Sequence, residues 1–486
     1  SQSDLAQNAS VQKASLASAQ VPVTDAISIY EAMARALKYN LDHRVAMMES
    51  ALAKGETRVA TLEMLPDLTS RAGYNGRNNY SGSFSRPILD RREVGAKGGR
   101  ATTSSDLKSF SGDLTLSWNI LDFGLSYVRA QQAGDRALIA GEKERSVANR
   151  LIEDVRSAYW RAISADYLRS QFKSLEGQTR VALSRSRKQR KSGLIPPVTG
   201  LTYERELLDI NKQIHNLTAD LLIAKAELAK LMNLTPGTTF QLEQPKRHLR
   251  YPALGLSLDE MTDIGLQNRP EMREVLYEGR INAKETRANL LELLPTAQLS
   301  VGLNGDTNDL LFNSNWIGAG ASAAWNVMRS LKYPAKRNVT KAKGEIIREQ
   351  ALATSMAIMT QIHVGRIRYA MLRKELHTTN HYYQVQRQLL AQVKRQAQAG
   401  AAGDHTVIRE RMNTLVARVK RDVVYADFQN ALASIFWSMG IDPYDVNLST
   451  DQSLEAMTQS LESLWRDNRL PDALTLTSGV QVAKAN

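Results

Sequence analysis

The chain has 486 residues, 43% of them hydrophobic and 23% charged, a composition that excludes a disordered polymer and indicates two or three folded units. It contains no cysteine, which excludes a disulfide framework, a thiolate zinc site and a lipid-bearing N-terminal cysteine. The net charge of +13 comes from Lys and Arg interleaved with Asp and Glu, as on solvated helix surfaces. No apolar run approaches the roughly 18 residues that a transmembrane helix needs. The first residues, SQSDLAQ, are interpreted as a mature N-terminus.

The sequence is internally duplicated. The stretch EMLPDLTSRAGYNG, which contains Pro66, resembles ELLPTAQLSVGLNG, which contains Pro295, at a shift of 229 positions (295 − 66). Further along, Trp118-Asn119 matches Trp325-Asn326 at a shift of 207 (325 − 118). Because the shift is constant except between the two paired segments, one surface loop is shorter in the second copy.

Each copy predicts the same elements in the same order. Two amphipathic helices are followed by a strand that begins at a Leu-Pro pair, a loop, a second strand, a helix of about 60 to 70 residues that starts near Ser126 in the first copy, a glycine turn and a return helix of about 30 residues. The longest helix would extend about 100 Å and therefore needs lateral partners along its length.

These elements give an expected organisation in nine segments. They are an N-terminal extension (1–22), the helices of the first copy (23–65), its β-hairpin (66–120), its helical hairpin (121–233), a linker (234–257), the helices of the second copy (258–294), its β-hairpin (295–328), its helical hairpin (329–440) and a C-terminal, linker-like tail (441–486).

The predicted strands alternate between apolar and polar side chains, which gives each strand two different faces. The segment 113–124, DLTLSWNILDFG, has Leu114, Leu116, Trp118 and Ile120 on one face and Asp113, Thr115, Ser117 and Asn119 on the other. The segments 67–75, 296–304 and 317–327 show the same pattern, the last one with Trp325 and Val327 on the apolar face. Strands of roughly 10 residues, as these are, are long enough to cross a bilayer at a tilt.

Two interpretations of these strands are open. Either they form a soluble sheet packed on helices, or their apolar faces meet lipid and their polar faces line a lumen. A lipid-exposed sheet needs closed edges, and four strands cannot close a barrel, so the second interpretation requires oligomerisation: a dimer supplies eight strands and a trimer twelve. The polar faces favour the wider, water-filled barrel. The connections 77–102 and 306–315 are then expected to be extracellular loops.

The ordered set of motifs resembles the TolC family of outer-membrane channel-tunnels. The resemblance rests on the opening helices ARALKYNLDHRVAMMES and DIGLQNRPEMREVLYEG, the strand starts LPDLT and LPTAQLS, the segments WNILDFG and WNVM, and the turns KSGLIPP and QAGAAGD. It covers about Val23 to Pro443. It implies a mainly α-helical fold with a transmembrane β-barrel: a trimeric 12-strand barrel with four strands per protomer, continued by a long α-helical barrel.

The same resemblance implies a function and partners. The chain would be a passive exit channel in the outer membrane of a Gram-negative bacterium, extending into the periplasm as part of a tripartite efflux pump or a type I secretion system. Its partners would be two further copies of itself in a homotrimer, a periplasmic adaptor (membrane fusion) protein, an inner-membrane transporter and outer-membrane lipid, with no nucleic acid and no cofactor. The alternative is a soluble, basic, elongated coiled-coil scaffold that binds nucleic acid along its helices.

No catalytic constellation is recognised, so the chain is not expected to be an enzyme. His377 and His381, in HTTNH, lie four apart on a predicted helix and could share a metal ion. The segment lacks a glutamate between them and offers no third ligand, so a solvated or packed helix face is the preferred interpretation.

The first glycine turn ends a strongly basic segment, RSRKQRKSG. Cations near a helix C-terminus are favoured by its dipole, by about 0.3–1 kcal/mol each, and Gly193 supplies a left-handed cap. The functional interpretation is a surface that binds the adaptor. The candidates for that contact at the two turns are Arg187, Lys188, Arg190, Lys191, Gly193, Gly400 and Gly403.

The second turn, AGAAGDHTVIRERM, is expected by analogy with the family to line a narrow periplasmic entrance. Asp404, Arg409 and Glu410 are the candidates for this gate, with Asp404 also expected to cap the return helix. Arg409 beside Glu410 gives a mixed ring of charges rather than a purely acidic one, so strong cation selectivity is not expected. The basic residues 187–191 are the predicted ionic partners of these candidates.

Overall fold

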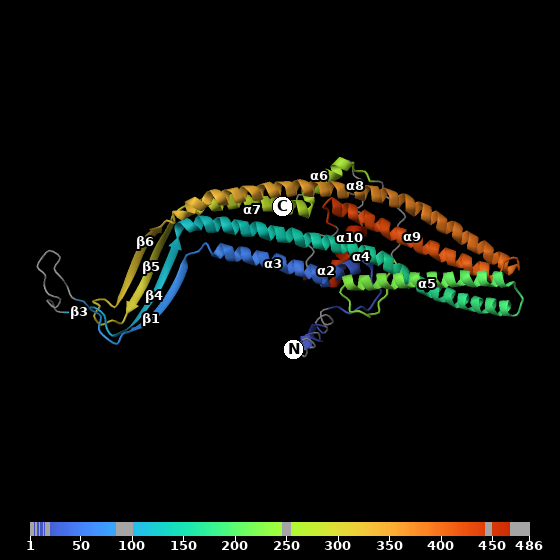
Figure 1. Ribbon diagram of the computed structural model, residues 1–486, viewed down its shortest axis with the longest axis horizontal. Helices are drawn as coiled ribbons and strands as arrows, with labels where there is room; N and C mark the ends of the chain where they lie inside the picture. Colours follow the sequence, from blue (N-terminus) through green and yellow to red (C-terminus); the bar gives the residue numbers. More distant parts are fainter. Residues whose placement is uncertain are drawn as a thin grey trace. The chain divides into compact units, whose positions relative to one another are not determined.

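A computed structural model describes residues 20–83, 101–244, 254–442 and 450–466, and a few of the first nineteen. The chain is mainly α-helical with a small antiparallel sheet (Figure 1), which confirms the predicted mainly helical class. It forms two compact units: unit 1 comprises residues 1–50, 140–275 and 350–486, and unit 2 comprises residues 51–139 and 276–349. Within the described ranges, no helix is both long enough and apolar enough to span a membrane.

The two copies of the duplication have the same order of elements. The first contains α2 (Ile29–Tyr39), α3 (Leu41–Leu62), β1 (Asp67–Gly76), β4 (Lys108–Asn119), α4 (Ile120–Lys191) and α5 (Pro197–Leu231). The second contains α6 (Leu258–Asn268), α7 (Pro270–Leu291), β5 (Thr296–Asp306), β6 (Asn315–Ala324), α8 (Met328–Gln398) and α9 (Asp404–Ser438). The short strands β2 (Gly82–Ser83) and β3 (Thr102–Thr103) pair within the first strand connection, and α10 (Leu454–Arg466) follows α9.

Two predicted boundaries are wrong. Helix α4 begins at Ile120 rather than near Ser126, because the side-chain oxygen of Asn119 accepts a hydrogen bond from the backbone N–H of Asp122 (3.2 Å) and so caps the helix directly after the strand. Strand β6 ends at Ala324, so Trp325 and Val327 lie outside it.

The C-terminal tail was predicted to be linker-like, and this is also wrong for residues 454–466. They form the amphipathic helix α10, whose residues Leu454, Met457, Leu461 and Trp465 are buried in the core of unit 1. The helical spacing of these four apolar residues was the signal that the prediction missed.

The four long strands form one sheet in the order β1-β4-β5-β6, all antiparallel. The two predicted hairpins are present, and pairing of β4 with β5 joins them. Leu116 of β4 is opposite Leu68 of β1 and Val301 of β5, and Val301 is opposite Ala319 of β6. Most of the first connection, residues 84–100, lies outside the described residues.

The helices of unit 2 are fastened by polar contacts through α7. Asp135 of α4 is 2.7 Å from Arg280 and 2.6 Å from Lys284 of α7. On the other side of α7, the Asn289 amide donates to the Thr340 hydroxyl of α8 (2.9 Å). In this unit α3, α4, α7 and α8 follow one another in the same order as the strands to which they connect (Figure 1).

Unit 1 has an apolar core built by α2, α4, α9 and α10. Met33, Tyr159 and Phe436 are fully buried, and the Tyr159 hydroxyl donates to the backbone carbonyl of Ile27 (2.9 Å). Serine residues start two of the helices: Ser28 caps α2, and Ser257 forms a capping box with Glu260 at the start of α6.

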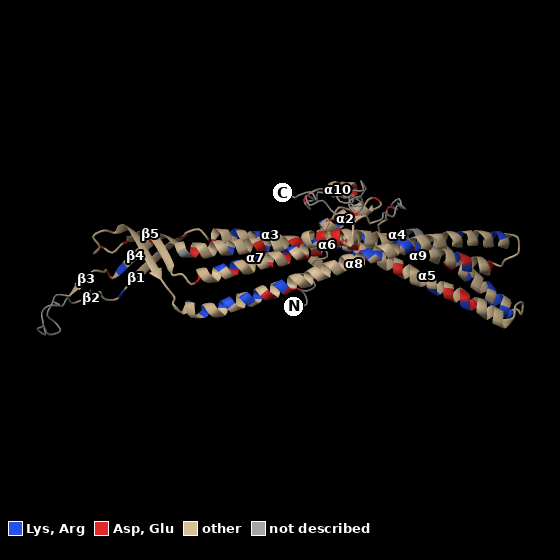
Figure 2. Ribbon diagram, turned by 90° about the horizontal axis from the view of Figure 1, so that it is seen from above, with Lys and Arg blue, Asp and Glu red and all other residues tan. Residues whose placement is uncertain are grey.

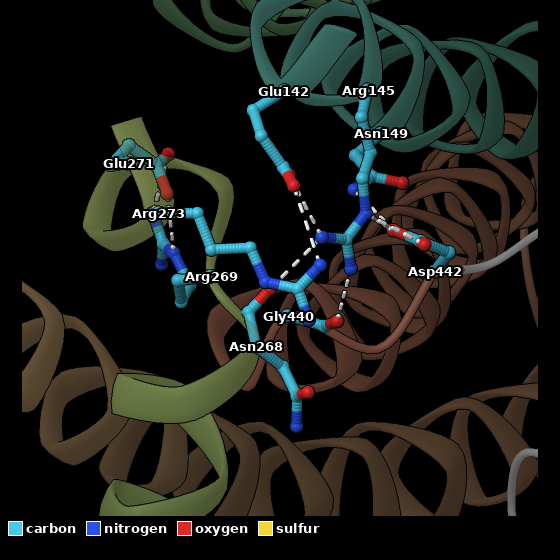
Figure 3. Close-up of polar contacts among 9 residues, drawn as sticks. All are labelled: Glu142, Arg145, Asn149, Asn268, Arg269, Glu271, Arg273, Gly440 and Asp442. Carbon is cyan, nitrogen blue, oxygen red and sulfur yellow. Dashed lines mark hydrogen bonds and ion pairs between the residues drawn. The ribbon is translucent and has the colours of Figure 1, made fainter. Parts of the chain in front are cut away.

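Arg145 of α4 fixes the end of α9 within unit 1 (Figure 3). Its guanidinium donates to the Asp442 carboxylate (2.7 Å), to the carbonyl of Gly440 (2.8 Å) and to the carbonyl of Asn268 (3.0 Å). Gly440 has φ +68°, and a Cβ there would lie 2.5 Å from the Asn268 carbonyl carbon, so only glycine fits this close approach.

Candidate functional site

The apolar face of the sheet is exposed. Leu114, Leu116 and Trp118 of β4 are 42%, 46% and 40% exposed. The polar residues that alternate with them, Thr115 and Ser117, are less exposed and half-buried. In a soluble sheet packed on helices the apolar side chains would be the buried set. Strand β4 therefore shows the opposite distribution from that of a water-soluble sheet.

These apolar side chains form one continuous band across all four strands. Leu116 pairs with Leu68 and Val301, as described above, and in the next apolar row Leu303 lies opposite Leu114 and Ile317. The rings of Tyr74 and Phe110 meet at 4.9 Å between centroids. Among the residues that the structure describes, no helix covers this band, so its chemistry suits contact with lipid acyl chains.

The opposite face carries small and hydroxyl side chains. The Thr115 hydroxyl donates to Asp113 (3.0 Å), and its cross-strand neighbour is Gly302, where a Cβ would lie 2.7 Å from that hydroxyl oxygen. Such a face is polar, which suits contact with water.

The sheet is open at both sides. In the described part of the chain, β1 pairs only with β4, and β6 pairs only with β5. Each outer strand therefore presents unpaired backbone groups next to an apolar face. Such an edge cannot be left in a lipid environment, so a sheet of this kind needs strands from other chains.

The first helical turn is closed by an internal ion cluster. Gly193 has φ +73°, as predicted for a left-handed cap. Arg190 and Arg187 contact the buried Glu204 of α5 at 2.9 and 3.3 Å, and the hydrogen bond from Arg190 lowers the pKa of the Glu204 carboxyl below its usual value. A Cβ at Gly200 would lie 2.9 Å from the Cδ of Arg190, so glycine leaves space for that side chain. Lys188 and Lys191 are exposed.

The second helical turn places the three gate candidates differently from one another. Glu410 is 9% exposed and accepts a hydrogen bond from Gln386 of α8 (2.8 Å), so it fastens α9 to α8 within one hairpin. The Arg409 side chain is 47% exposed, 3.4 Å from Glu410. Gly400 has φ +75°. The prediction that Asp404 caps α9 is wrong: the cap position is Gly403, and Asp404 is the first helical residue.

Polar side-chain contacts at the tip connect the two helical hairpins. Arg185 of α4 is 3.0 Å from Asp404 of α9, and the His405 Nε2 is 2.6 Å from the Glu206 carboxylate of α5. The ring of His405 also lies 4.3 Å from that of Tyr203, between centroids. The predicted pairing of residues 187–191 with Asp404 is therefore wrong for Arg187 and Arg190, which bind Glu204 instead. Sequence spacing carries no signal for contacts between residues that belong to different copies of the duplication.

The histidine pair that the sequence offered as a candidate metal site is not part of a ligand set among the described residues. His377 and His381 are both exposed on α8. Within the described ranges, no group of three or more His, Asp or Glu side chains is arranged to hold a metal ion.

Comparisons with known proteins agree with this geometry. Residues 32–234 match the outer membrane efflux protein family. No curated protein sequence matches the chain. Among solved structures, the chain is similar to the CmeC outer membrane channel of Campylobacter jejuni, with a TM-score of 0.68 and 14% identity over 92% of this chain and 95% of that chain.

Two further solved structures have the same fold. The MtrE outer membrane channel of Neisseria gonorrhoeae, solved in its open state, gives a TM-score of 0.61 and 15% identity over 85% of this chain and 89% of that chain. The outer membrane protein VceC of Vibrio cholerae gives a TM-score of 0.60 and 13% identity over 85% and 96%. The resemblance to channel-tunnels of the TolC type, expected from the sequence motifs, is confirmed.

Proposed function

We propose that this chain, whose residues 32–234 match the outer membrane efflux protein family, is an exit channel of the outer membrane that reaches into the periplasm. The observation that carries the proposal is the apolar band on the sheet. Its side chains are exposed, they continue across four strands, and both edges of the sheet are open. A lipid environment accounts for the exposed apolar side chains, and association of several copies accounts for the open edges.

The assembled channel is a homotrimer in this proposal. Three sheets close into a 12-strand barrel with the polar faces inside, and the helices continue it as an α-helical barrel. Four strands cannot close alone, and the polar face has small side chains suited to a wet lumen. The channel is a passive conduit in a tripartite efflux pump or a type I secretion system. A periplasmic adaptor contacts the helical tips, where Lys188 and Lys191 are exposed, and an inner-membrane transporter supplies the cargo.

The entrance is gated at the helical tips. The contacts between the two hairpins, Arg185 with Asp404 and His405 with Glu206, restrain the tips in one arrangement. The Arg185–Asp404 pair is exposed, and such a pair contributes only about 0–1 kcal/mol, so it can be broken without unfolding the hairpins. Arg409 contributes its exposed charge to the entrance, and Glu410 stiffens α9 against α8. Opening is then a shift between two existing arrangements of the tips.

The test is single-channel conductance of the purified chain in planar bilayers. The wild type should form discrete conducting steps, and Arg185→Ala with Asp404→Ala should conduct more because a restraint of the closed tip is lost. Arg409→Ala with Glu410→Ala should also raise the conductance. The matched control is Arg180→Ala with Glu176→Ala, which removes an ion pair within one helix. A wild type that never conducts would contradict the channel, and tip variants that match the control would contradict the gate.

A further inference from the structure

Helix α3 exposes its large apolar side chains, which is the reverse of what a helix on the surface of a soluble protein does. Its buried and half-buried face carries small or polar side chains, among them Ala53, Thr57 and Ala60. Its exposed face carries Leu52, Val59 and Leu62, which are 63%, 57% and 64% exposed. The exposed set, here called the α3 seam, continues toward the start of the helix with Leu41, Val45 and Met48. The successive spacings are four, three, four, seven and three residues, which fit the contact stripe of a coiled coil.

Helix α8 presents a matching stripe at the other side of unit 2. Met328, Leu331, Val339 and Ile346 are all more than half exposed and share one side of the helix. Strands β1 and β6 are the two outer strands of the sheet; α3 leads into β1, and α8 follows β6. When copies close a sheet edge to edge, the β6 edge of one copy meets the β1 edge of the next, and α8 is brought beside α3 of that copy.

Charged residues flank both stripes at intervals of seven. An acidic row on α3 and the segment after it consists of Glu49, Glu56 and Glu63, and all three are exposed. A basic row on α8 consists of Arg329, Lys336 and Lys343, which are also exposed. Figure 2 shows Lys and Arg gathered along this first part of α8. Seven residues are two helical turns, so each row stays on one side of its helix.

The two rows match in an antiparallel register. Glu56 lies 11 residues before the start of β1, and Lys336 lies 12 residues after the end of β6. Both residues are therefore at a similar distance from the sheet along their helices. Helix α3 runs toward the sheet and α8 runs away from it, and at 100° per residue both rows then project from the same surface of the joined wall. The members one heptad away match in the same way: Glu63 with Arg329, and Glu49 with Lys343.

Contacts within one copy leave the basic row available. Lys336 binds Glu292 in the same chain, but Glu292 also pairs with Arg129 at 3.2 Å, so it keeps a partner if Lys336 turns to a neighbour. Arg329 donates to the backbone carbonyl of Glu292 (3.4 Å). Among the described residues, no acidic side chain pairs with Arg329 or with Lys343.

We propose that the α3 seam packs antiparallel against α8 of a second copy of this chain, with the acidic row Glu49, Glu56 and Glu63 paired in register with the basic row Lys343, Lys336 and Arg329. The inference rests on the proposed assembly of copies and adds to it which helices meet, in which direction and at which register. The seam supplies the apolar contact area, and the rows select the register, since a slip of one turn would separate the charges.

Cysteine cross-linking tests the register directly, because the chain contains no cysteine of its own. Glu56→Cys with Lys336→Cys, treated with a short bis-maleimide in detergent, should convert most of the protein into covalent oligomers on a denaturing gel. The matched control is Glu56→Cys with Arg337→Cys, because Arg337 is the neighbouring residue on a different side of α8 and should give no covalent oligomer. Native mass spectrometry of the untreated wild type reports independently whether copies associate at all.

A charge exchange provides the second arm. Glu56→Lys or Lys336→Glu alone should lower the oligomeric fraction roughly two- to five-fold, and the two changes together should restore it, since an exposed pair is worth up to about 1 kcal/mol. A wild-type oligomer without the Glu56–Lys336 cross-link, or a double exchange that restores nothing, would overturn the register while leaving the channel intact. A monomeric wild type would overturn the seam together with the proposed function.

Discussion

The interior of unit 1 and the sheet of unit 2 distribute their apolar side chains in opposite ways. In unit 1, Tyr159 and Phe436 are fully buried among helices, and the Tyr159 hydroxyl donates to the backbone carbonyl of Ile27. In unit 2, Leu116 and Trp118 point outward, whereas the hydroxyl side chains of the same strand are half-buried. Burial of apolar surface stabilises a protein by roughly 25 cal/mol per Å², so the first pattern is complete within one chain, and the second requires something outside it.

The two patterns correspond to two sources of stability, one within a single chain and one from its surroundings. A chain can fold its helical core alone. In the proposed channel, a sheet with an exposed apolar face and two open edges gains its stability on assembly and insertion. The α3 seam extends the same pattern to a helix, because its larger apolar side chains are again on the exposed side.

The largest expected effect comes from placing a charge on the apolar face. Leu116→Arg should reduce the yield of membrane-inserted assembly strongly, because an arginine facing lipid at mid-bilayer costs about 2–4 kcal/mol. Thr115→Arg is the matched control: it is the adjacent residue on the polar face, where the new side chain meets water and lies near Asp113. The measurement is the oligomeric fraction recovered from membranes by detergent. Equal yields for the two variants would remove the distinction between the faces.

A smaller effect is expected at the first helical tip, where the contacts are ionic. The pKa of Glu204 is lowered in the folded chain by its hydrogen bond from Arg190, so its carboxylate stabilises the tip above the ordinary pKa of 4.5. That contribution is lost as the pH falls through the lowered pKa. Glu204→Gln should therefore melt at a lower temperature than the wild type at pH 7, and the two melting temperatures should converge as the pH falls below the lowered pKa. Glu176→Gln, on α4, removes a carboxylate with a single exposed partner and is the control that should show little change. A constant difference across this pH range would exclude the ionic origin.

The sequence predicted most of the fold because its signals are periodic and occur twice. The alternation of Leu114, Leu116 and Trp118 identified β4, and the glycine at 193 identified the turn after α4. The four-strand order was not predictable, because pairing of β4 with β5 joins strands that belong to different copies of the duplication and lie far apart in the chain. The α10 helix was missed because its short amphipathic pattern follows a stretch rich in turn-forming residues.

The candidate tip was predicted only at the level of residue type. Asp404 and Arg409 are exposed, as an entrance requires, but Glu410 is buried against Gln386. The partners of these residues depend on how α4, α5 and α9 pack around Phe172, Leu207 and Met412, and that packing is not encoded in local spacing. Arg185 belonged to the basic segment, yet nothing local distinguished it from Arg187.

The central claim is that the apolar face of the sheet meets lipid and the polar face meets water. Fluorescence quenching in reconstituted bilayers tests it most directly, using a variant in which Trp118 is the only tryptophan and a second in which Thr115→Trp replaces it. Trp118, which is 40% exposed in the isolated chain, should be quenched by brominated lipids and shielded from aqueous iodide. The tryptophan at position 115 should show the reverse. If Trp118 is quenched by iodide and not by brominated lipid, the apolar face does not contact the membrane, and the account is contradicted.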